Sequence, residues 1–181
     1  MKITELALPG ALLLELVTHR DERGSFTELH QRERYSRAGI DVDFLQDNLS
    51  ISKRGVLRGL HFQNPHPQGK LVTVLAGVTF SVAVDLRRSS KTFGRWISVE
   101  LSRESGRQLW LPPGFAHGFV AMAEEVMMLY KVCGPWRPEC ERTLRWDDPD
   151  VAVEWPVQKP VLSPKDAAGL TLRELEAHLF D

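Results

Sequence analysis

The sequence contains little cysteine and no excess of charge of either sign. Among its 181 residues only Cys133 and Cys140 are cysteines. Two cysteines build no disulfide framework, and their spacing fits neither a zinc site nor a CxxC redox pair, so free thiols in a reducing cytoplasm are expected. The formal net charge of -1 leaves no basic excess for binding a phosphate backbone, so nucleic acid is not an expected partner.

Long apolar runs are missing as well. No segment reaches the ~20 apolar residues of a membrane-spanning helix, so no membrane partner is expected. The uncharged run 6–14 lies between Glu5 and Glu15, and no small-residue cleavage site follows it. We therefore expect a first strand here rather than the apolar part of a signal peptide.

What the sequence does contain fits one globular domain over residues 1–181. Hydrophobic residues make up 43% and charged residues 26%, as in ordinary folded proteins. Runs rich in Val, Leu, Ile, Phe and Trp predict strands, and Gly, Pro, Asn and Ser separate them. Strands at this short spacing favour an all-β sandwich or barrel over a parallel sheet. The predicted strands are 42–52, 56–63, 70–75, 78–86, 96–101, 108–111 and 126–132.

Two short helices are also expected. Residues 31–38 predict one or two helical turns before a glycine, and the capping box at 171–174 predicts a C-terminal helix that ends near Leu179. Alternation along the strand 78–86 places Thr79 and Ser81 on one face.

His61 lies in the run Arg58-Gly59-Leu60-His61-Phe62-Gln63. A lone histidine is more often a core residue with satisfied hydrogen bonds. Here Arg58, His61 and Gln63 interrupt an apolar segment, and buried polar groups cost free energy unless they bind something. Strand alternation puts His61 and Gln63 on one face, and Arg58 joins them only if Gly59 breaks the pleat.

His117 follows a tight turn in the run Pro113-Gly114-Phe115-Ala116-His117, which delivers it at the start of the next strand. The run resembles half of a cupin motif, but the His-x-His of metal-binding cupins is absent. His61, His66 and His117 leave a metal-dependent cupin open as an alternative. Because His66 lies between two prolines in a loop, we expect no metal site.

Aromatic and basic residues suggest how a nucleotide could be held. Tyr130 lies on the strand 126–132, where a core tyrosine with a backbone partner is the ordinary alternative. Trp136, between two prolines, either covers the core edge or stacks on a nucleobase, worth about 1–3 kcal/mol per base. Four cations near turns or strand starts could together neutralise a diphosphate: Arg23, Arg58, Lys70 and Lys165.

Taken together, these segments resemble the dTDP-4-dehydrorhamnose 3,5-epimerase family. Arg-Gly-Leu-His at 58–61 and Pro-x-Gly-Phe-Ala-His-Gly-Phe at 112–119 are too long for a chance match. The matching segments follow one another in order over most of the chain: 21–26, 46–50, 55–63, 69–72, 82–87, 111–119, 130–131, 145–149 and 155–156.

The resemblance implies a mainly β fold, a cupin-type jelly-roll β-sandwich with a few short helices, which forms a homodimer and uses no metal or other cofactor. It implies 3,5-epimerisation of dTDP-4-dehydro-6-deoxy-D-glucose to dTDP-4-dehydro-L-rhamnose. On the matching positions it implies His61 as general base, Tyr130 as general acid and Asp166 as the partner of the histidine. Trp136 takes the place of an aromatic that stacks on thymine. The other implied substrate contacts are Arg23, Glu28, Gln46, Asp47, Asn48, Arg58, Lys70, His117, Glu141 and Lys165.

The chemistry of a 4-keto sugar explains these residue types. The C4 ketone acidifies the hydrogens on both adjacent carbons, and a neutral imidazole suits their removal. A carboxylate at Asp166 fixes the imidazole tautomer, and the enolate oxygen needs a cation, a role for Lys70. Inversion needs a proton from the opposite face, which Tyr130 supplies.

Ser81 departs from the family pattern. The family usually reads Phe-Asp-Val-Ala-Val-Asp, where residues 80–85 here read Phe-Ser-Val-Ala-Val-Asp. Ser81 thus replaces an inward-facing carboxylate able to pair with Lys70. A C3-only or C5-only epimerase of a related dTDP-4-keto-deoxysugar therefore stays open, beside the metal-dependent cupin and a non-catalytic sugar-nucleotide binding module.

Overall fold

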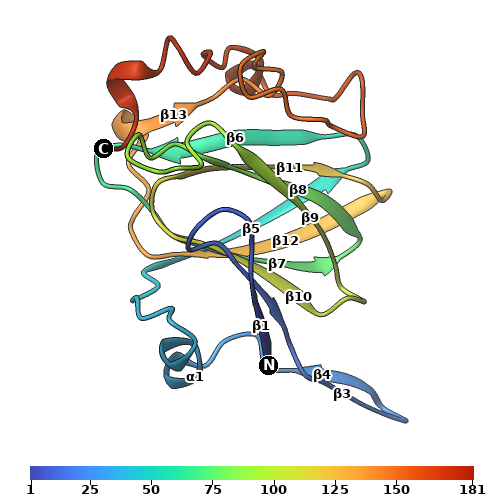
Figure 1. Cartoon of the computed structure of the whole chain (residues 1–181). Helices are drawn as coiled ribbons and strands as arrows, with labels where there is room; N and C mark the ends of the chain where they lie inside the picture. Colours follow the sequence, from blue (N-terminus) through green and yellow to red (C-terminus); the bar gives the residue numbers. More distant parts are fainter.

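A computed structural model, which describes residues 1–181, shows two facing β-sheets (Figure 1). The six-stranded sheet has the order β1-β2-β10-β7-β12-β5, and the five-stranded sheet has the order β13-β6-β11-β8-β9. All the pairings between neighbouring strands are antiparallel. The expected mainly β, jelly-roll sandwich is therefore confirmed.

The strands are short, as the spacing of the breakers predicts. In chain order they are β1 (Lys2–Glu5), β2 (Leu12–Glu15), β3 (Thr18–Asp21), β4 (Gly24–Thr27), β5 (Gln46–Lys53), β6 (Leu57–Gln63), β7 (Lys70–Ala76), β8 (Val78–Asp85), β9 (Trp96–Ser102), β10 (Arg107–Leu111), β11 (Phe115–Ala121), β12 (Glu125–Val132) and β13 (Glu141–Thr143). The helical elements are α1 (Arg32–Arg37), α2 (Pro164–Ala167) and the 3-10 turns η1 (Pro138–Cys140) and η2 (Glu176–His178). None of these helices is long and apolar enough to cross a membrane.

Side chains that alternate along the strands divide between three apolar clusters. The main core lies between the sheets and includes Val72 of β7 and Met128 of β12. The outer face of the five-stranded sheet packs against the C-terminal segment, and Val82 and Leu175 belong to the same buried cluster there. Tyr35 of α1 belongs to a third cluster, on the outer face of the six-stranded sheet. Each sheet is thus covered on its outer side, at least in part.

The strands β3 and β4 form a separate two-stranded hairpin. Figure 1 shows it projecting from the foot of the sandwich, beside the N-terminus. Phe26 on this hairpin is 69% exposed. Contact with a partner surface would explain why this large aromatic ring is exposed on a projecting hairpin.

The run 6–14 does not form the single strand that its composition predicts. Leu12 to Leu14 belong to β2, but residues 6–11 fold back in a turn closed by a hydrogen bond from the Leu6 amide to the Ala11 carbonyl, 3.0 Å. Gly10 adopts a φ of +89° in this turn, which suits glycine. The apolar side chains of Leu8 and Ala11 are buried in the main core instead of lying along a strand.

The expected C-terminal helix is reduced to the short 3-10 helix η2. The capping hydrogen bonds do form, because the Thr171 hydroxyl donates to the Glu174 carboxylate at 2.7 Å and accepts the Glu174 amide at 3.2 Å. After them the chain makes only turns and the single 3-10 turn η2. Leu175 and Leu179 are buried on the outer face of the five-stranded sheet, and this packing overrides the local helical preference.

Candidate active site

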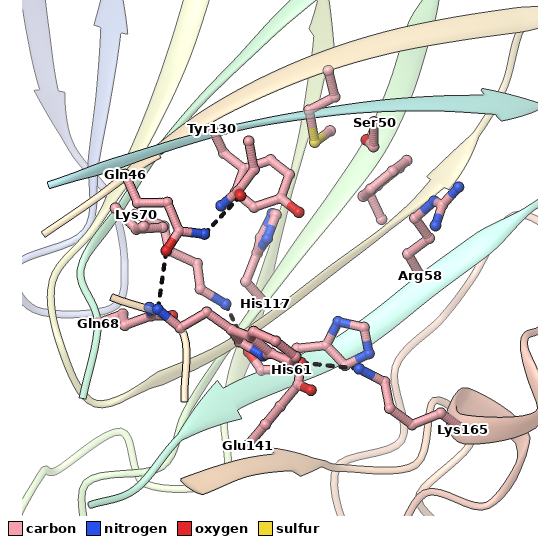
Figure 2. A pocket seen from close by; sticks show the side chains of 15 residues that line it. Gln46, Ser50, Arg58, His61, Gln68, Lys70, His117, Tyr130, Glu141 and Lys165 are labelled. Carbon is pink, nitrogen blue, oxygen red and sulfur yellow. Dashed lines mark hydrogen bonds and ion pairs between the residues drawn. The ribbon is translucent and has the colours of Figure 1, made fainter. Parts of the chain in front are cut away.

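A cavity of about 360 Å³ lies between the two sheets. Both sheets contribute walls, and the loops before β7 and after β12 contribute the rim (Figure 2). The residues that line it are Gln46, Asn48, Ser50, Arg58, His61, Gln68, Lys70, His117, Phe119, Met128, Tyr130, Val132, Trp136, Glu141 and Lys165. Most of the side chains expected to bind substrate therefore meet in one place.

Gly59 allows Arg58 and His61 to face the same cavity. Strand alternation alone would put residues three apart on opposite faces, but the register between β6 and β11 shifts here, so that His61 pairs with His117 and Arg58 pairs with Phe119. Gly59 has a φ of +124°, and a Cβ at this position would lie 2.5 Å from the Cα of Gly118. The break of the pleat at Gly59 is thus confirmed, and only glycine fits it.

His61 is held by the carboxylate of Asp166. Its Nε2 lies 2.5 Å from Oδ1 of Asp166, and the Ser163 hydroxyl donates to Oδ2 at 2.9 Å. Burial alone raises the pKa of Asp166, but hydrogen bonding and charge from His61, together with Ser163, hold it below its usual value. The carboxylate is therefore ionised, Nε2 of His61 carries a hydrogen and donates it, and Nδ1 is the nitrogen left free to accept a proton.

Lys70 and His117 lie beside the histidine. The Lys70 ammonium donates to the backbone carbonyl of His61 at 3.0 Å. Loss of hydration lowers the pKa of Lys70 to about 8, against the opposing effect of Glu141. Burial, helped by the charges of Lys70 and His61, lowers the pKa of His117 to about 3, so this imidazole is neutral. Nε2 of His117 is buried and has no hydrogen-bond partner within the protein, so it is available to a ligand.

Tyr130 approaches the cavity from the opposite wall. It belongs to β12 of the six-stranded sheet, whereas His61 belongs to β6 of the five-stranded sheet, and Figure 2 shows the two rings on facing sides. Burial raises the pKa of Tyr130, and the charge of Arg58 opposes this rise. The phenol therefore keeps its proton at neutral pH and can donate it.

Polar contacts fix the side chains at the two ends of the cavity. Nε of Arg58 donates to the Ser52 hydroxyl at 2.9 Å. At the rim, the Gln46 amide oxygen accepts the backbone amide of Trp136 at 3.0 Å, and Trp136 remains 54% exposed. An aromatic face left open at the mouth of a polar cavity suits stacking on a flat ring.

Glu141 and Lys165 form an ion pair at the cavity edge, with 2.9 Å between the carboxylate and the ammonium. Burial raises the pKa of Glu141, but the hydrogen bond and charge of Lys165 outweigh this and lower it. The pair thus presents one anion and one cation to a ligand.

Three of the expected substrate contacts do not reach this cavity. Asp47 points to the other face of β5, because its neighbours Gln46 and Asn48 line the cavity, and its carboxylate pairs with the Lys131 ammonium at 2.7 Å. Arg23 lies on the β3–β4 hairpin, paired with its neighbour Asp21. Glu28, just after the hairpin, pairs with Arg34 at 2.7 Å.

Ser81 does not line the cavity either. Its hydroxyl is fully buried and lies 3.2 Å from the Thr79 hydroxyl, so the expected sharing of one strand face by these two residues is confirmed. The ammonium of Lys70 contacts a backbone carbonyl and no carboxylate. Lys70 therefore lacks a direct anionic partner, which is part of why burial lowers its pKa so far.

The three histidines of the metal-site alternative do not come together. His61 and His117 line the cavity, whereas His66 lies in the loop that follows β6, and its carbonyl accepts a hydrogen bond from the Gln63 amide. No group of three or more His, Cys, Asp or Glu side chains is placed to hold a metal ion. Both cysteines are free thiols.

Three polar residues at the site were not singled out from the sequence: Gln68 on the loop before β7, Ser50 and Ser163. Ser50 lines the cavity with a buried hydroxyl that has no partner, and alternation along β5 from Gln46 and Asn48 would have pointed to it. Ser163 contacts the site only through Asp166, and no local pattern signals such a contact between distant segments.

The fold and this cavity agree with comparisons to known proteins. The sequence profile of the dTDP-4-dehydrorhamnose 3,5-epimerase family matches residues 5–174. A dTDP-4-dehydrorhamnose 3,5-epimerase of Pseudomonas aeruginosa is 50% identical over 171 residues, which are 93% of this chain and 94% of the relative. The chain belongs to this family. It is accordingly an isomerase, a carbohydrate epimerase.

Two solved structures of family-like epimerases are similar along nearly the whole chain. The dTDP-6-deoxy-D-glucose-3,5-epimerase of Legionella pneumophila, in complex with dTDP-4-keto-L-rhamnose, has a TM-score of 0.95 at 45% identity and covers 99% of this chain and 96% of its own. A 3'-monoepimerase of Streptomyces bikiniensis, in complex with dTDP-quinovose, has a TM-score of 0.90 at 32% identity and covers 96% of this chain and 90% of its own. The shared epimerase fold thus accommodates dTDP-sugars in both relatives.

Proposed function

We propose that this epimerase converts dTDP-4-dehydro-6-deoxy-D-glucose to dTDP-4-dehydro-L-rhamnose by inverting C3 and C5. The observation that carries the proposal is a base and an acid on opposite walls of one cavity. His61, paired with Asp166, comes from the five-stranded sheet, and Tyr130 comes from the six-stranded sheet. A sugar ring between them meets a proton acceptor on one face and a proton donor on the other, which is what inversion requires.

His61 removes the proton. The hydrogens on the carbons beside the C4 ketone are acidic, and Nδ1 of the neutral imidazole accepts one of them as the carbon's electron pair moves to the ketone oxygen. Asp166 keeps the imidazole in this tautomer and stabilises the imidazolium that forms. Water takes no part in this step.

Lys70 and Tyr130 complete the cycle. The enolate oxygen carries the negative charge, and a charged Lys70 ammonium beside His61 stabilises it. The Tyr130 phenol then donates its proton to the same carbon from the opposite face, which inverts the centre. After His61 and Tyr130 have exchanged protons with solvent, the same two proton transfers invert the second carbon beside the ketone.

The nucleotide part is held at the edges of the cavity. Arg58 and Lys165 supply cations for the diphosphate, with the guanidinium of Arg58 oriented by Ser52. Trp136 stacks its exposed ring on thymine. Gln46, Asn48 and His117 contribute neutral hydrogen-bonding groups on the walls.

A homodimer would bring in the residues that this chain's own cavity lacks. We infer that the β3–β4 hairpin extends into a second copy, because it projects from the body and exposes Phe26. Arg23 and Glu28 would then contact substrate in the partner's cavity. Size-exclusion chromatography with light scattering tests the dimer, and a monomer at working concentration rejects it.

Two free thiols support a reducing cytoplasm as the place of action.

The decisive experiment follows the substrate by NMR in deuterated buffer, coupled to a reductase that traps the product. Labelling at both C3 and C5, lost in His61→Asn, supports double epimerisation. Labelling at one carbon only would establish the monoepimerase alternative, which the similarity to the 3'-monoepimerase and the serine at position 81 keep relevant. Binding of the dTDP-sugar without any exchange would instead identify a binding module.

A further inference from the structure

Ser163 extends the His61–Asp166 pair by one more hydrogen bond. Oδ1 of Asp166 faces Nε2 of His61 at 2.5 Å, and Oδ2 accepts the Ser163 hydroxyl at 2.9 Å. The Ser163 oxygen also accepts the backbone amide of Asp166 at 3.1 Å. The hydroxyl oxygen thus accepts one hydrogen bond, and because an ionised carboxylate can only accept, the hydroxyl hydrogen is the one donated to Oδ2.

This second hydrogen bond determines how the carboxylate can act. The Asp166 side chain is only 4% exposed, so few donors can reach Oδ2, and Ser163 provides one. A donor at Oδ2 prevents rotation of the carboxylate about its Cβ–Cγ bond and withdraws charge from Oδ1. Both effects bear on His61: the first orients the ring into the cavity, and the second keeps the shared proton on the imidazole rather than on Asp166.

The chain contains the same local motif at a place where it has no such consequence. Thr171 donates to the Glu174 carboxylate at 2.7 Å and accepts the Glu174 amide at 3.2 Å. Glu174 is exposed and outside the cavity. Capping a turn therefore accounts for the motif at Thr171, whereas at Ser163 the carboxylate also holds a side chain of the site.

We propose that Ser163 is a positioning residue for the epimerisation: its hydroxyl orients Asp166 and limits the basicity of that carboxylate, and through it sets the direction and proton affinity of the His61 ring. The proposal rests on the proposed function of His61 as the base. It assigns no contact between Ser163 and substrate, because Ser163 does not line the cavity.

Of the charged and titratable groups around the pair, only Lys165 lies on the helix that Ser163 caps. Lys165 lies on the same short helix, Glu141 on β13, His117 on β11 and Lys70 on β7. A shift in the pH profile of a Ser163 variant therefore reports the loss of the hydroxyl.

The test compares Ser163→Ala and Ser163→Thr with Thr171→Ala as matched control. Without the donor, more negative charge stays on Oδ1 and favours the imidazolium, so Ser163→Ala moves the acid limb of kcat/KM to higher pH. Because Ser163 is itself exposed, water can replace part of its effect, and kcat falls by about three- to tenfold with KM nearly unchanged. Ser163→Thr keeps a hydroxyl at this position and should retain the wild-type kcat and the wild-type acid limb of kcat/KM. Thr171→Ala should also keep the wild-type pH profile.

Ser163→Gly guards the test against a folding defect, because glycine is tolerated at the N-cap of a helix yet carries no hydroxyl. It is expected to behave like Ser163→Ala. If both variants keep the wild-type kcat and pH profile, the proposal is overturned, and so it is if Thr171→Ala changes the profile as much.

An NMR titration of the His61 imidazole signals separates this proposal from the proposed function. The signals of Ser163→Ala should titrate at higher pH than those of the wild type, whether or not the enzyme turns over the expected sugar. Unchanged titration overturns the role of Ser163. A wild type that shows no proton exchange in the sugar overturns the function instead.

Discussion

Replacing Asp166 by asparagine should slow proton exchange at both sugar carbons by two orders of magnitude or more. The carboxylate accepts one hydrogen bond from His61 at 2.5 Å, and a hydrogen bond to a charged group contributes about 1.5–3 kcal/mol. Since each 1.4 kcal/mol is about a factor of ten, losing this bond alone costs about 10- to 150-fold in rate.

The asparagine can also change which ring nitrogen of His61 carries the hydrogen. Its amide nitrogen can donate to Nε2 of His61, which would move the ring hydrogen to Nδ1 and remove the lone pair that accepts the substrate proton. In Ser-His-Asp enzymes a wrong tautomer costs up to about 10⁴-fold. The expected loss in kcat for Asp166→Asn therefore lies between about 10²- and 10⁴-fold.

The assay measures initial rates of deuterium incorporation at C3 and C5 by NMR, together with KM. KM should change by no more than about threefold, because a group that acts in the transition state leaves ground-state binding intact. Asp147→Asn is the matched control, since this exposed carboxylate pairs with Arg145 at 2.8 Å outside the cavity. An Asp166→Asn enzyme within threefold of wild type in kcat would refute the role of the carboxylate.

Four further predictions follow from the geometry. Tyr130→Phe removes the opposite-face donor, so deuterium should enter the sugar without inversion, and a product of normal stereochemistry would contradict this assignment. Because the pKa of Lys70 is lowered to about 8, kcat should fall as the pH rises through this value. Lys70→Arg should move this alkaline limb of the kcat profile to higher pH, and an unmoved limb would assign it to another group. The pKa of His117 falls from 6.5 to about 3 on folding, so the unfolded state binds more protons as the pH falls. The free energy of unfolding should therefore drop by about 2 kcal/mol from pH 6.5 to pH 5, and urea titrations should show a smaller drop in His117→Gln. In Gly59→Ala the new Cβ would clash with the backbone of β11 at a φ of +124°, so the protein should lose about 2–5 kcal/mol of stability. Gly24→Ala is the control, because Gly24 has a φ of +127° but open space around it, and it should lose less stability in the same denaturation experiment.

The strands and the central site residues were accessible from the sequence because they depend on local patterns. Alternation predicts which side of a strand a residue faces, and the glycine at 59 signals the break that brings Arg58 to the side of His61. The same alternation along β5 also explains why Asp47 points away while Gln46 faces the cavity. Residue types and spacing were sufficient for these features.

The remainder depends on contacts between distant segments. The run 6–14 bends because Leu8 is buried in the main core, and the C-terminal helix is replaced by turns because Leu175 packs on a sheet. The partner of His61 lies 105 positions further along the chain, so only the family resemblance pointed to Asp166. Nothing local pointed to Ser163.

The position of Asp166 outside both sheets has a consequence for how the catalytic pair is held together. Asp166 lies on α2, and the chain after it buries Leu175 and Leu179 on the outer face of the five-stranded sheet. The histidine thus belongs to the sheet and its carboxylate to the segment that covers it, so the pair depends on how this cover is seated. A substitution that loosens this cover is therefore expected to lower activity by moving the carboxylate away from His61, although it touches no residue of the cavity.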